Sequence, residues 1–490
     1  MAISRSLIHI INALHLLLLH LAVSQYNIVT VGSQSSNIIR SLPGFSGNLP
    51  FKLETGYVGV GDGDEIQLFY YFIESERNPE EDPLVLWLTG GPGCSAFSGL
   101  IYEIGPLTFD YEISSWNSTT LLYNPYSWTK VANIIFLDAP VGTGFSYATT
   151  WQAYYTGDRL SAATNYNFLR KWLMTHPKFL KNPLYVAGDS FSGIVVPITV
   201  QEINNGNEVG VEPLMNLKGY MLGNPLTDEH VDHNSKVEFS YRKALISDQL
   251  YESAKINCKG EYINIDIENA LCRKDIEIFH ECTANLSISH ILEPQCPVTA
   301  SPRPALLKLH PSRALIEDDH SINLLLSLSH LPNDHPSMCR DFHYFYSGYW
   351  ANDQTVQNAL QIRKGSKERW SRCNRTLAYN FEVSSSTDYH RNLMNKGYRV
   401  LVYSGDQDII VPYVGTLEWI GALNLTVAHA WKPWFVDGQV AGYTVHYRSK
   451  KHDLTFATVK DAGHTAPEYK PKECLAMVDR WLAHKPVYSQ

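Results

Sequence analysis

The chain has 490 residues, 44% of them hydrophobic, and a net charge of −9 at neutral pH. This length suits one large α/β domain with an insertion, or two to three ordinary domains. The 11 Trp and 29 Tyr exclude a largely disordered chain. The acidic balance and the absence of a basic stripe with interleaved aromatic residues exclude nucleic acid as a partner.

The N-terminal segment has the pattern of a secretory signal peptide. A basic residue, Arg5, precedes an apolar run over 7–23. Small residues, Ala22 and Ser24, lie at the end of this run. We therefore expect a signal peptide over 1–24. The alternative is a membrane anchor, which the interruption of the run by His15 and His20 and the lack of a basic flank disfavour. No later stretch is apolar enough to span a bilayer, so no membrane association is expected after cleavage.

The cysteine pattern fits an oxidising compartment rather than a metal site. None of the eight cysteines forms CxxC, and no HExxH is present. We therefore expect no bound metal. Four sequons are permissive for glycosylation. They lie at Asn117, Asn285, Asn374 and Asn424.

Short apolar runs bounded by Gly, Pro or Asp predict buried strands, and helical stretches such as Asp158–Met174 lie between them. This alternation predicts an α/β fold with a mostly parallel central sheet. The expected strands are Leu84–Leu88, Asn133–Leu137, Leu184–Ala187, Tyr220–Leu222, Arg399–Tyr403 and Leu454–Val459.

The alternating pattern is interrupted over 236–338, which contains four cysteines and a Pro- and Ser-containing tract. We interpret this region as an inserted, disulfide-rich cap between the two parts of the core, 25–235 and 339–490. The tract over 297–332 is a possible site of proteolytic processing. The alternative is an ordinary run of helices and loops with no lid role.

The central chemical signal is the segment YVAGDSFSG, in which a strand runs into a turn at Ser190. A nucleophile elbow needs small residues around the serine because the turn is tight and its backbone strained. The usual second glycine is replaced by Ser192, with Gly193 one place later. Alone, a serine between small residues is more often structural.

Two later strands end in partners for this serine. The strand over 399–403 runs into SGDQD, which contains Asp408, and the strand over 454–459 runs into DAGH, which ends in His464. The order Ser, Asp, His is the order of α/β-hydrolases, and each residue follows a strand. Asp406 is the rival for the carboxylate.

A glycine-rich segment, TGGPGC, follows the first strong strand. We expect the backbone amide of Gly91 and that of Phe191, next to the nucleophile, to form an oxyanion hole. The alternative is merely a tight turn. A second glycine pair, at Gly142 and Gly144, superficially suggests a nucleotide loop but lacks a third glycine and a following helix, so no cofactor is expected.

Together these motifs resemble the plant serine carboxypeptidase-like family. The motifs are TGGPGCSAFSGL, NIIFLDAPVGTGFSY, PLYVAGDSFSG, SGDQD and AGHTAPEYKP. The resemblance covers nearly the whole mature chain and implies an α/β-hydrolase fold with Ser190, Asp408 and His464 as the triad. It also implies three disulfides and leaves Cys282 and Cys474 unpaired. The implied pairs are Cys94–Cys373, Cys258–Cys272 and Cys296–Cys339.

The positions at which the sequence departs from the family pattern affect which class of substrate the site is expected to bind. The resemblance implies substrate contacts at Thr89, Gly90, Glu103, Asp189 and Thr465. Peptide-cutting members hold the substrate carboxylate with an Asn where Thr89 stands and, in most cases, a Glu where Thr465 stands. A carboxylate site that lacks its Asn donor should bind peptide ends poorly, because an unpaired buried charge is costly.

These replacements resemble the acyltransferase branch of the family. That resemblance implies transfer of an acyl group from a 1-O-acyl-β-glucose to an alcohol acceptor, in the vacuole or outside the cell. A serine carboxypeptidase or esterase is the second hypothesis. A catalytically inactive binding protein is the third, and the intact triad argues against it.

Overall fold

The short apolar runs form the parallel centre of a twelve-stranded sheet in the computed structural model, which describes residues 37–115, 118–296, 340–448 and 451–489. Six strands share one direction there. In sheet order they are β7 (Asn133–Leu137), β4 (Leu84–Leu88), β10 (Leu184–Asp189), β11 (Leu217–Gly223), β13 (Arg399–Gly405) and β16 (Asp453–Val459).

Antiparallel strands extend this centre at both edges, so the sheet is mixed. The strand β3 (Ile66–Ile73) pairs antiparallel with β7 and with β2 (Leu53–Val60). At the other edge, β15 (Gln439–Arg448) lies antiparallel between β16 and β14 (Thr426–Val436). Two further short strands belong to the same sheet. They are β1 (Asn37–Ile39) and β8 (Tyr147–Ala148).

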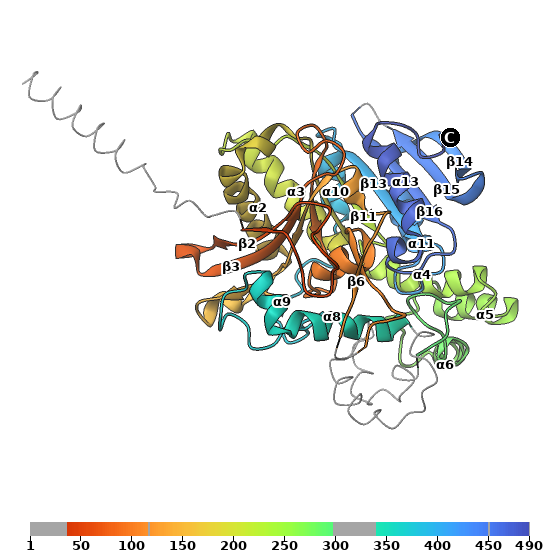
Figure 1. The fold of residues 1–490 in the computed structure, drawn as a ribbon. Coiled ribbons are helices and arrows are strands. Elements are labelled where there is room, and N and C mark those ends of the chain that lie inside the picture. Colours follow the sequence, from red (N-terminus) through yellow and green to blue (C-terminus); the bar gives the residue numbers. More distant parts are fainter. Residues whose placement is uncertain (1–36, 116–117, 297–339, 449–450, 490) are drawn as a thin grey trace, which may run out of the picture. The chain divides into compact units, whose positions relative to one another are not determined.

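Strand residues alternate between two hydrophobic cores, one on each face of the sheet. In β4, Val85 and Trp87 point to one core, and Leu84 and Leu86 point to the other. Helices cover both faces, as the ribbon shows (Figure 1). One face carries α8 (His343–Asn352), α9 (Gln354–Ala359) and α13 (Pro471–Leu482), and the other carries α2 (Asp158–Thr175), α3 (Ser192–Glu208), α10 (Thr387–Met394) and α11 (Tyr413–Ala422).

Three helices within and beside the expected cap have a small core of their own. They are α4 (Glu229–Arg242), α5 (Asp248–Cys258) and α6 (Ala270–Thr283), and the Cys258–Cys272 disulfide joins the last two. Phe239 and Ile291 then pack against Ile409, in the loop after β13. The helical region therefore begins seven residues before the expected boundary at 236. The expected signal peptide (1–24) and processed tract (297–332) lie outside the described residues.

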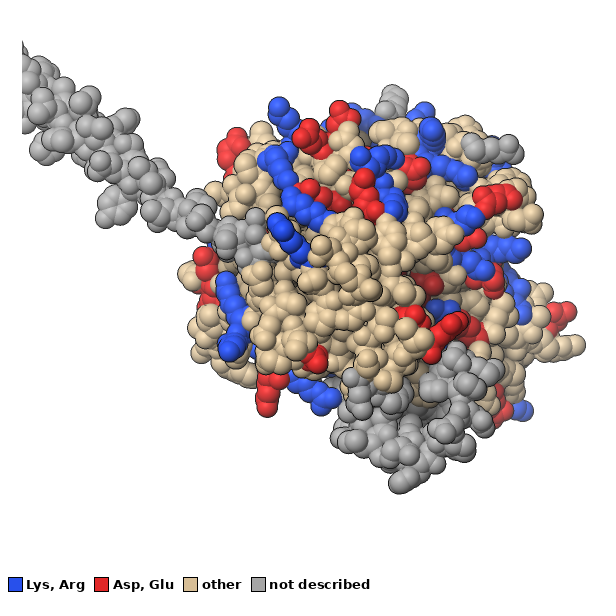
Figure 2. Space-filling model, in the orientation of Figure 1, with Lys and Arg blue, Asp and Glu red and all other residues tan. Residues whose placement is uncertain are grey.

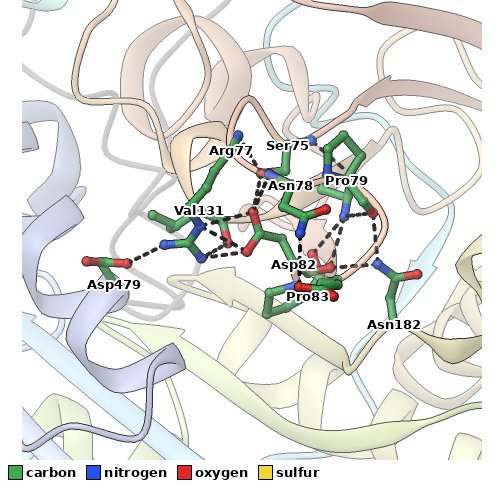
Figure 3. A network of polar contacts seen from close by, with 11 residues as sticks. Ser75, Arg77, Asn78, Pro79, Asp82, Pro83, Val131, Asn182 and Asp479 are labelled. Atoms are coloured by element: carbon green, nitrogen blue, oxygen red, sulfur yellow. Dashed lines mark hydrogen bonds and ion pairs between the residues drawn. The ribbon is translucent and has the colours of Figure 1, made fainter.

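A polar network ties together the amino ends of β4, β7 and β10 (Figure 3). The Asp82 carboxylate accepts hydrogen bonds from the Ser75 hydroxyl at 2.6 Å and from the Arg77 guanidinium. The side-chain amides of Asn133 and Asn182 donate to the backbone carbonyl oxygen of Asp82 at 3.0 and 2.7 Å. These contacts lie at the edge of the sheet opposite the strand ends that carry the expected triad.

Replacement of Asp82 with alanine is expected to lower the free energy of unfolding by about 3 kcal/mol, because a buried carboxylate with several charged and hydroxyl donors is lost. Denaturant titration measures this change. Activity per folded molecule should stay unchanged, since the network is remote from the triad. The matched control is Glu81→Ala, an exposed neighbour whose loss should cost less than about 0.5 kcal/mol.

Charged side chains of both signs are interspersed on the face drawn in Figure 2, around a broad uncharged area. No helix within the described ranges is both long and apolar enough to cross a membrane.

Candidate active site

The turn after β10 holds Ser190 in a strained backbone conformation. Ser190 has a φ of 55°, the left-handed region that side-chain-bearing residues rarely adopt. A Cβ atom on Gly188 would lie 2.3 Å from the carbonyl oxygen of Leu88, so this position must remain glycine. Ser192, at the usual second glycine, donates its hydroxyl to that same Leu88 oxygen at 2.8 Å. The serine at 192 therefore ties the elbow to β4 rather than disrupting it.

The structure brings Ser190, His464 and Asp408 together. The Nε2 atom of His464 lies 2.8 Å from Ser190 Oγ, and its Nδ1 atom lies 2.8 Å from Asp408 Oδ2. These residues follow β10, β16 and β13, whose carboxyl ends meet at one edge of the sheet. In this arrangement the imidazole can take the serine proton while the carboxylate orients the ring.

The Asp408 carboxylate is fully buried and held by four donors. Besides His464, the amides of Ile410 and Val411 donate to it at 2.7 and 3.2 Å. The side chain of Asn224 donates to Oδ2 at 2.8 Å. Asn224 was not among the expected site residues. Its position directly after β11, at the same edge of the sheet, was the available signal.

The rival carboxylate, Asp406, lies elsewhere. It accepts hydrogen bonds from the backbone amide of Asp461 at 2.8 Å and from the Gln407 side chain at 2.9 Å. Neither contact involves His464. Asp406 therefore connects the loops after β13 and β16, and Asp408 occupies the position beside the imidazole.

The backbone amides of Gly91 and Phe191 border the nucleophile. The backbone amide of the preceding residue, Gly90, donates to Asp189 Oδ1 at 3.1 Å. The backbone amides of Gly91 and Phe191 meet no acceptor within the described part of the chain. A Cβ atom on Gly90 would lie 2.6 Å from Ser190 Cβ, so the glycine segment lies directly against the serine. Both free amides are available to a developing oxyanion.

Two long-range contacts hold the glycine segment in place. The Cys94–Cys373 disulfide joins its end to a segment 279 residues away in sequence. The buried Asp138 carboxylate accepts from the Ser95 hydroxyl at 2.6 Å and from the amide of Phe145 at 2.9 Å. A Cβ atom on Gly144 would lie 2.1 Å from Asp138, so the glycine there permits the turn to wrap around this carboxylate.

A buried cluster of charged side chains adjoins the triad. Burial, reinforced by Asp189 and Glu468, raises the pKa of Glu103 well above its ordinary range, although Arg372 opposes the shift. Burial raises the pKa of Asp189 to about 6, while the charge of His464 and the Gly90 amide lower it. The Oε2 atom of Glu103 is buried and meets no partner among the described residues. Burial therefore favours the neutral form of Glu103.

The two expected threonines have different side-chain partners, and only Thr465 contacts this cluster. Thr89 Oγ1 accepts a hydrogen bond from the indole Nε1 of Trp87 at 3.1 Å. Thr465 Oγ1 donates to Glu468 Oε2 at 2.7 Å. Glu468 and Arg372 were missed in the sequence, although Glu468 lies in the GHTAPEY motif and Arg372 precedes Cys373, the expected partner of Cys94.

Two aromatic rings pack against Phe191, the residue that follows Ser190. The ring of Phe191 packs edge-on against Tyr379 and Phe381, with centroids 5.9 and 5.6 Å away. Phe381 is 44% exposed.

The remaining expectations concern cysteines and sequons. Cys296 is disulfide-bonded, whereas Cys339 lies outside the described residues. Cys282 and Cys474 are free. Among the sequons, Asn285 and Asn424 are exposed. Asn374 is half-buried and its side chain donates to the carbonyl oxygen of Gly142 at 2.9 Å, so it is the least accessible to glycosylation of the three described sequons. Asn117 lies outside the described residues.

The pH profile of kcat/KM should report the environment of His464. Burial lowers the pKa of His464, but its ion pair and hydrogen bond with Asp408 outweigh burial and raise it above 6.5. Only the neutral imidazole accepts the serine proton, so activity should rise with pH through a midpoint above 6.5. Rates with a neutral ester across the pH range measure this midpoint.

Two substitutions should move that midpoint in opposite directions. The charge of Asp189 raises the pKa of His464 and that of Lys236 lowers it. We therefore expect Asp189→Asn to lower the midpoint and Lys236→Met to raise it. A midpoint below 6.5 in the native enzyme, or shifts of the same sign in both variants, would contradict this description of the site.

The sheet topology and the strand-end position of Ser190, Asp408 and His464 define the chain as an α/β-hydrolase. The family model described as serine carboxypeptidase matches residues 43–484, and the chain belongs to this family. It is similar to serine carboxypeptidase-like 8 of Arabidopsis thaliana, with 46% identity over 92% of this chain and 96% of that protein. Serine carboxypeptidase-like 1 of the same plant is 49% identical over 92% and 94%.

Among solved structures, the fold is similar to that of Kex1, a prohormone-processing carboxypeptidase from Saccharomyces cerevisiae. The TM-score is 0.68 at 19% identity, and the match covers 92% of this chain and 96% of that chain. At this identity the likeness supports the fold alone. The expected α/β-hydrolase fold is thereby confirmed.

Proposed function

We propose that this protein transfers an acyl group from a 1-O-acyl-β-glucose to an alcohol acceptor through an acyl-enzyme on Ser190. The observation that carries the proposal is the continuous hydrogen-bonded chain from Asp408 through His464 to Ser190, with two backbone amides free beside it. The choice of transfer over peptide cleavage rests on Thr89 and Thr465, which replace the carboxylate-binding residues of peptide-cutting relatives.

In the first half-reaction, neutral His464 takes the proton of the Ser190 hydroxyl as Oγ attacks the ester carbonyl carbon. The carbonyl oxygen becomes an oxyanion that accepts hydrogen bonds from the amides of Gly91 and Phe191. As the intermediate collapses, the bond to the glucose oxygen breaks, and His464 returns its proton to that oxygen. Glucose leaves, and the acyl group remains on Ser190.

In the second half-reaction, the acceptor hydroxyl loses its proton to His464 while its oxygen attacks the acyl carbon. Collapse of this intermediate forms the new ester and returns the proton to Ser190. Transfer must outcompete hydrolysis by water, which requires an acceptor held in position. Well-oriented groups reach effective molarities of ~10⁵ M or more. We expect the acyl chain to contact the aromatic cluster of Phe191, Tyr379 and Phe381, whose rings pack against one another.

The second candidate is a serine carboxypeptidase. The buried Glu103, whose pKa is raised well above its ordinary range, and Asp189, whose pKa is raised to about 6, favour it, because a neutral carboxyl group can donate to a substrate carboxylate. The absence of an Asn at position 89 argues against it. Both candidates use the same three residues, so only products distinguish them.

Product analysis tests the proposal. The purified enzyme is incubated with a panel of 1-O-acylglucoses and mixed alcohols, and with a blocked dipeptide in parallel. New esters detected by mass spectrometry, and absent with Ser190→Ala, would support transfer. Free acid or released amino acid without any ester would identify a hydrolase instead. The disulfides indicate an oxidising compartment, and we propose the vacuole as the site of action.

A further inference from the structure

The hydroxyl group of Thr465 has a fixed polarity. Its partner Glu468 also accepts from the Tyr344 hydroxyl at 2.9 Å and lies 3.4 Å from the Arg340 guanidinium. The Arg340 guanidinium and the Tyr344 hydroxyl both donate to this carboxylate. The carboxylate is likewise the acceptor in its contact with Thr465, whose hydroxyl donates to Oε2 at 2.7 Å. The hydrogen of this hydroxyl is committed to Glu468, and the lone pairs of its oxygen remain.

The hydroxyl group of Thr89 has the opposite polarity. An indole N–H can only donate, so the bond from Trp87 makes the Thr89 oxygen the acceptor. The hydroxyl hydrogen of Thr89 meets no acceptor within the described ranges and is left to donate. Thr89 precedes Gly90, which lies against Ser190, and Thr465 follows His464. Both threonines are partly exposed, so each can contact a ligand beside the nucleophile.

We propose that Thr89 and Thr465 form a donor and acceptor pair that recognises the neutral hydroxyl groups of a sugar, with Glu468 as the positioning residue that sets the polarity of Thr465. This inference rests on the proposed acylglucose donor and specifies how its sugar is selected. A sugar hydroxyl donates to Thr465 and accepts from Thr89, whereas a carboxylate can only accept and would face the oxygen of Thr465 without a hydrogen bond.

Glu103 supplies a second reason to expect a neutral polar ligand here. Its Oε2 atom is buried without a partner among the described residues, although a buried polar atom normally has one. The side chain interacts electrostatically with Asp189 and Glu468, which belong to the same cluster. A ligand hydroxyl would satisfy this atom without adding charge beside Asp189 and Glu468, and unlike a ligand carboxylate it can pair with Glu103 in either protonation state.

The test measures sugar release from a 1-O-acyl-β-glucose and from analogues that each lack one hydroxyl of the sugar. The readout is the ratio of kcat/KM between the full sugar and each analogue, so a general loss of activity cancels. The native enzyme should disfavour at least one analogue by about tenfold. Thr465→Val, which keeps the shape of the side chain, should reduce that ratio to within about twofold of unity. The exposed Thr175→Val, at the carboxyl end of α2, is the matched control and should keep the native ratio.

Glu468→Gln provides the independent measurement. The glutamine amide can donate to Thr465, which releases the threonine hydrogen toward the ligand. We expect kcat/KM for the corresponding glucuronate ester, relative to the glucose ester, to rise about tenfold. A purely structural role for Glu468 would lower both rates and leave their ratio unchanged.

The outcomes separate the two proposals. Native discrimination that persists in Thr465→Val, or a glucuronate ratio that Glu468→Gln does not change, would overturn the inference while acyl transfer stands. Cleavage of a simple ester without sugar release from any acylglucose would overturn the proposed function, and the inference with it. Loss of discrimination in Thr465→Val together with the gain in Glu468→Gln would support the inference.

Discussion

Replacement of Ser190 with alanine is expected to lower kcat by on the order of 10⁵-fold, because it removes the hydroxyl that lies 2.8 Å from the Nε2 atom of His464. The same residue is held at a φ of 55°, which costs any side-chain-bearing residue about 1–2 kcal/mol. Ser190→Ala retains this strain, whereas Ser190→Gly removes it. We therefore expect both variants to be inactive and the glycine variant to be about 1 kcal/mol more stable than the alanine variant.

Steady-state kinetics and denaturant titration measure the two effects separately. Ser192→Ala is a suitable control, because it removes a nearby hydroxyl that donates to Leu88 and does not face His464. It should lose stability by about 1 kcal/mol and retain far more activity than Ser190→Ala. Residual activity of Ser190→Ala within tenfold of the native value would show that Ser190 is not the nucleophile.

Replacement of Asp408 with asparagine is expected to lower kcat by on the order of 10³–10⁴-fold. The Oδ2 atom of Asp408 accepts from His464, Asn224 and Val411, whereas Oδ1 accepts from Ile410 alone. An amide oxygen would therefore occupy the Oδ2 place, where three donors converge. The imidazole would keep its orientation but lose the charge that stabilises its protonated form. The loss should appear in kcat more than in KM.

Asp406→Asn is the matched control, since it makes the same chemical change two residues away. Asp406 bonds to Asp461 and Gln407, not to His464, so its replacement should change kcat by less than about tenfold. If Asp406→Asn were the more damaging of the two, the assignment of the triad carboxylate would have to be reversed.

The central strands were predictable because they are buried on both faces. Such strands appear as unbroken apolar runs, and the bounds of β4 and β7 coincide with the expected Leu84–Leu88 and Asn133–Leu137. The expected strand over Tyr220–Leu222 was too short, since β11 spans Leu217–Gly223. Lys218 interrupts its apolar run, and this side chain is exposed at the end of the strand.

The antiparallel edges were missed because their strands are partly exposed and mix polar with apolar residues. Most residues of β14 are exposed or half-buried. A local signal was nevertheless present in Asp437-Gly438, which separates β14 from β15. Both residues have positive φ, 48° and 73°, as a two-residue hairpin turn requires. The pairing partner of each edge strand depends on contacts far along the chain, which a local pattern does not contain.

The residues of the site also fall into two groups, those predictable from the local sequence and those that depend on contacts between distant parts of the chain. The positions of Ser190, Asp408 and His464 follow from strand ends, and the structure brings all three together. The supporting residues, Asn224 and Glu468, act through contacts with side chains distant in sequence. Their hydrogen bonds depend on the assembled loops, so residue type and spacing alone could not specify them.

The Cys94–Cys373 disulfide has a consequence for how the enzyme is produced. The bond anchors the end of the segment that carries the Gly91 amide. In the cytosol of a bacterial host, thioredoxin and glutathione keep thiols reduced, and this anchor would not form. Such material would contain every catalytic side chain but a looser oxyanion loop. Inactivity of a preparation from that host would therefore show that the disulfide had not formed, not that the protein lacks activity. Functional screening requires a secretory expression system.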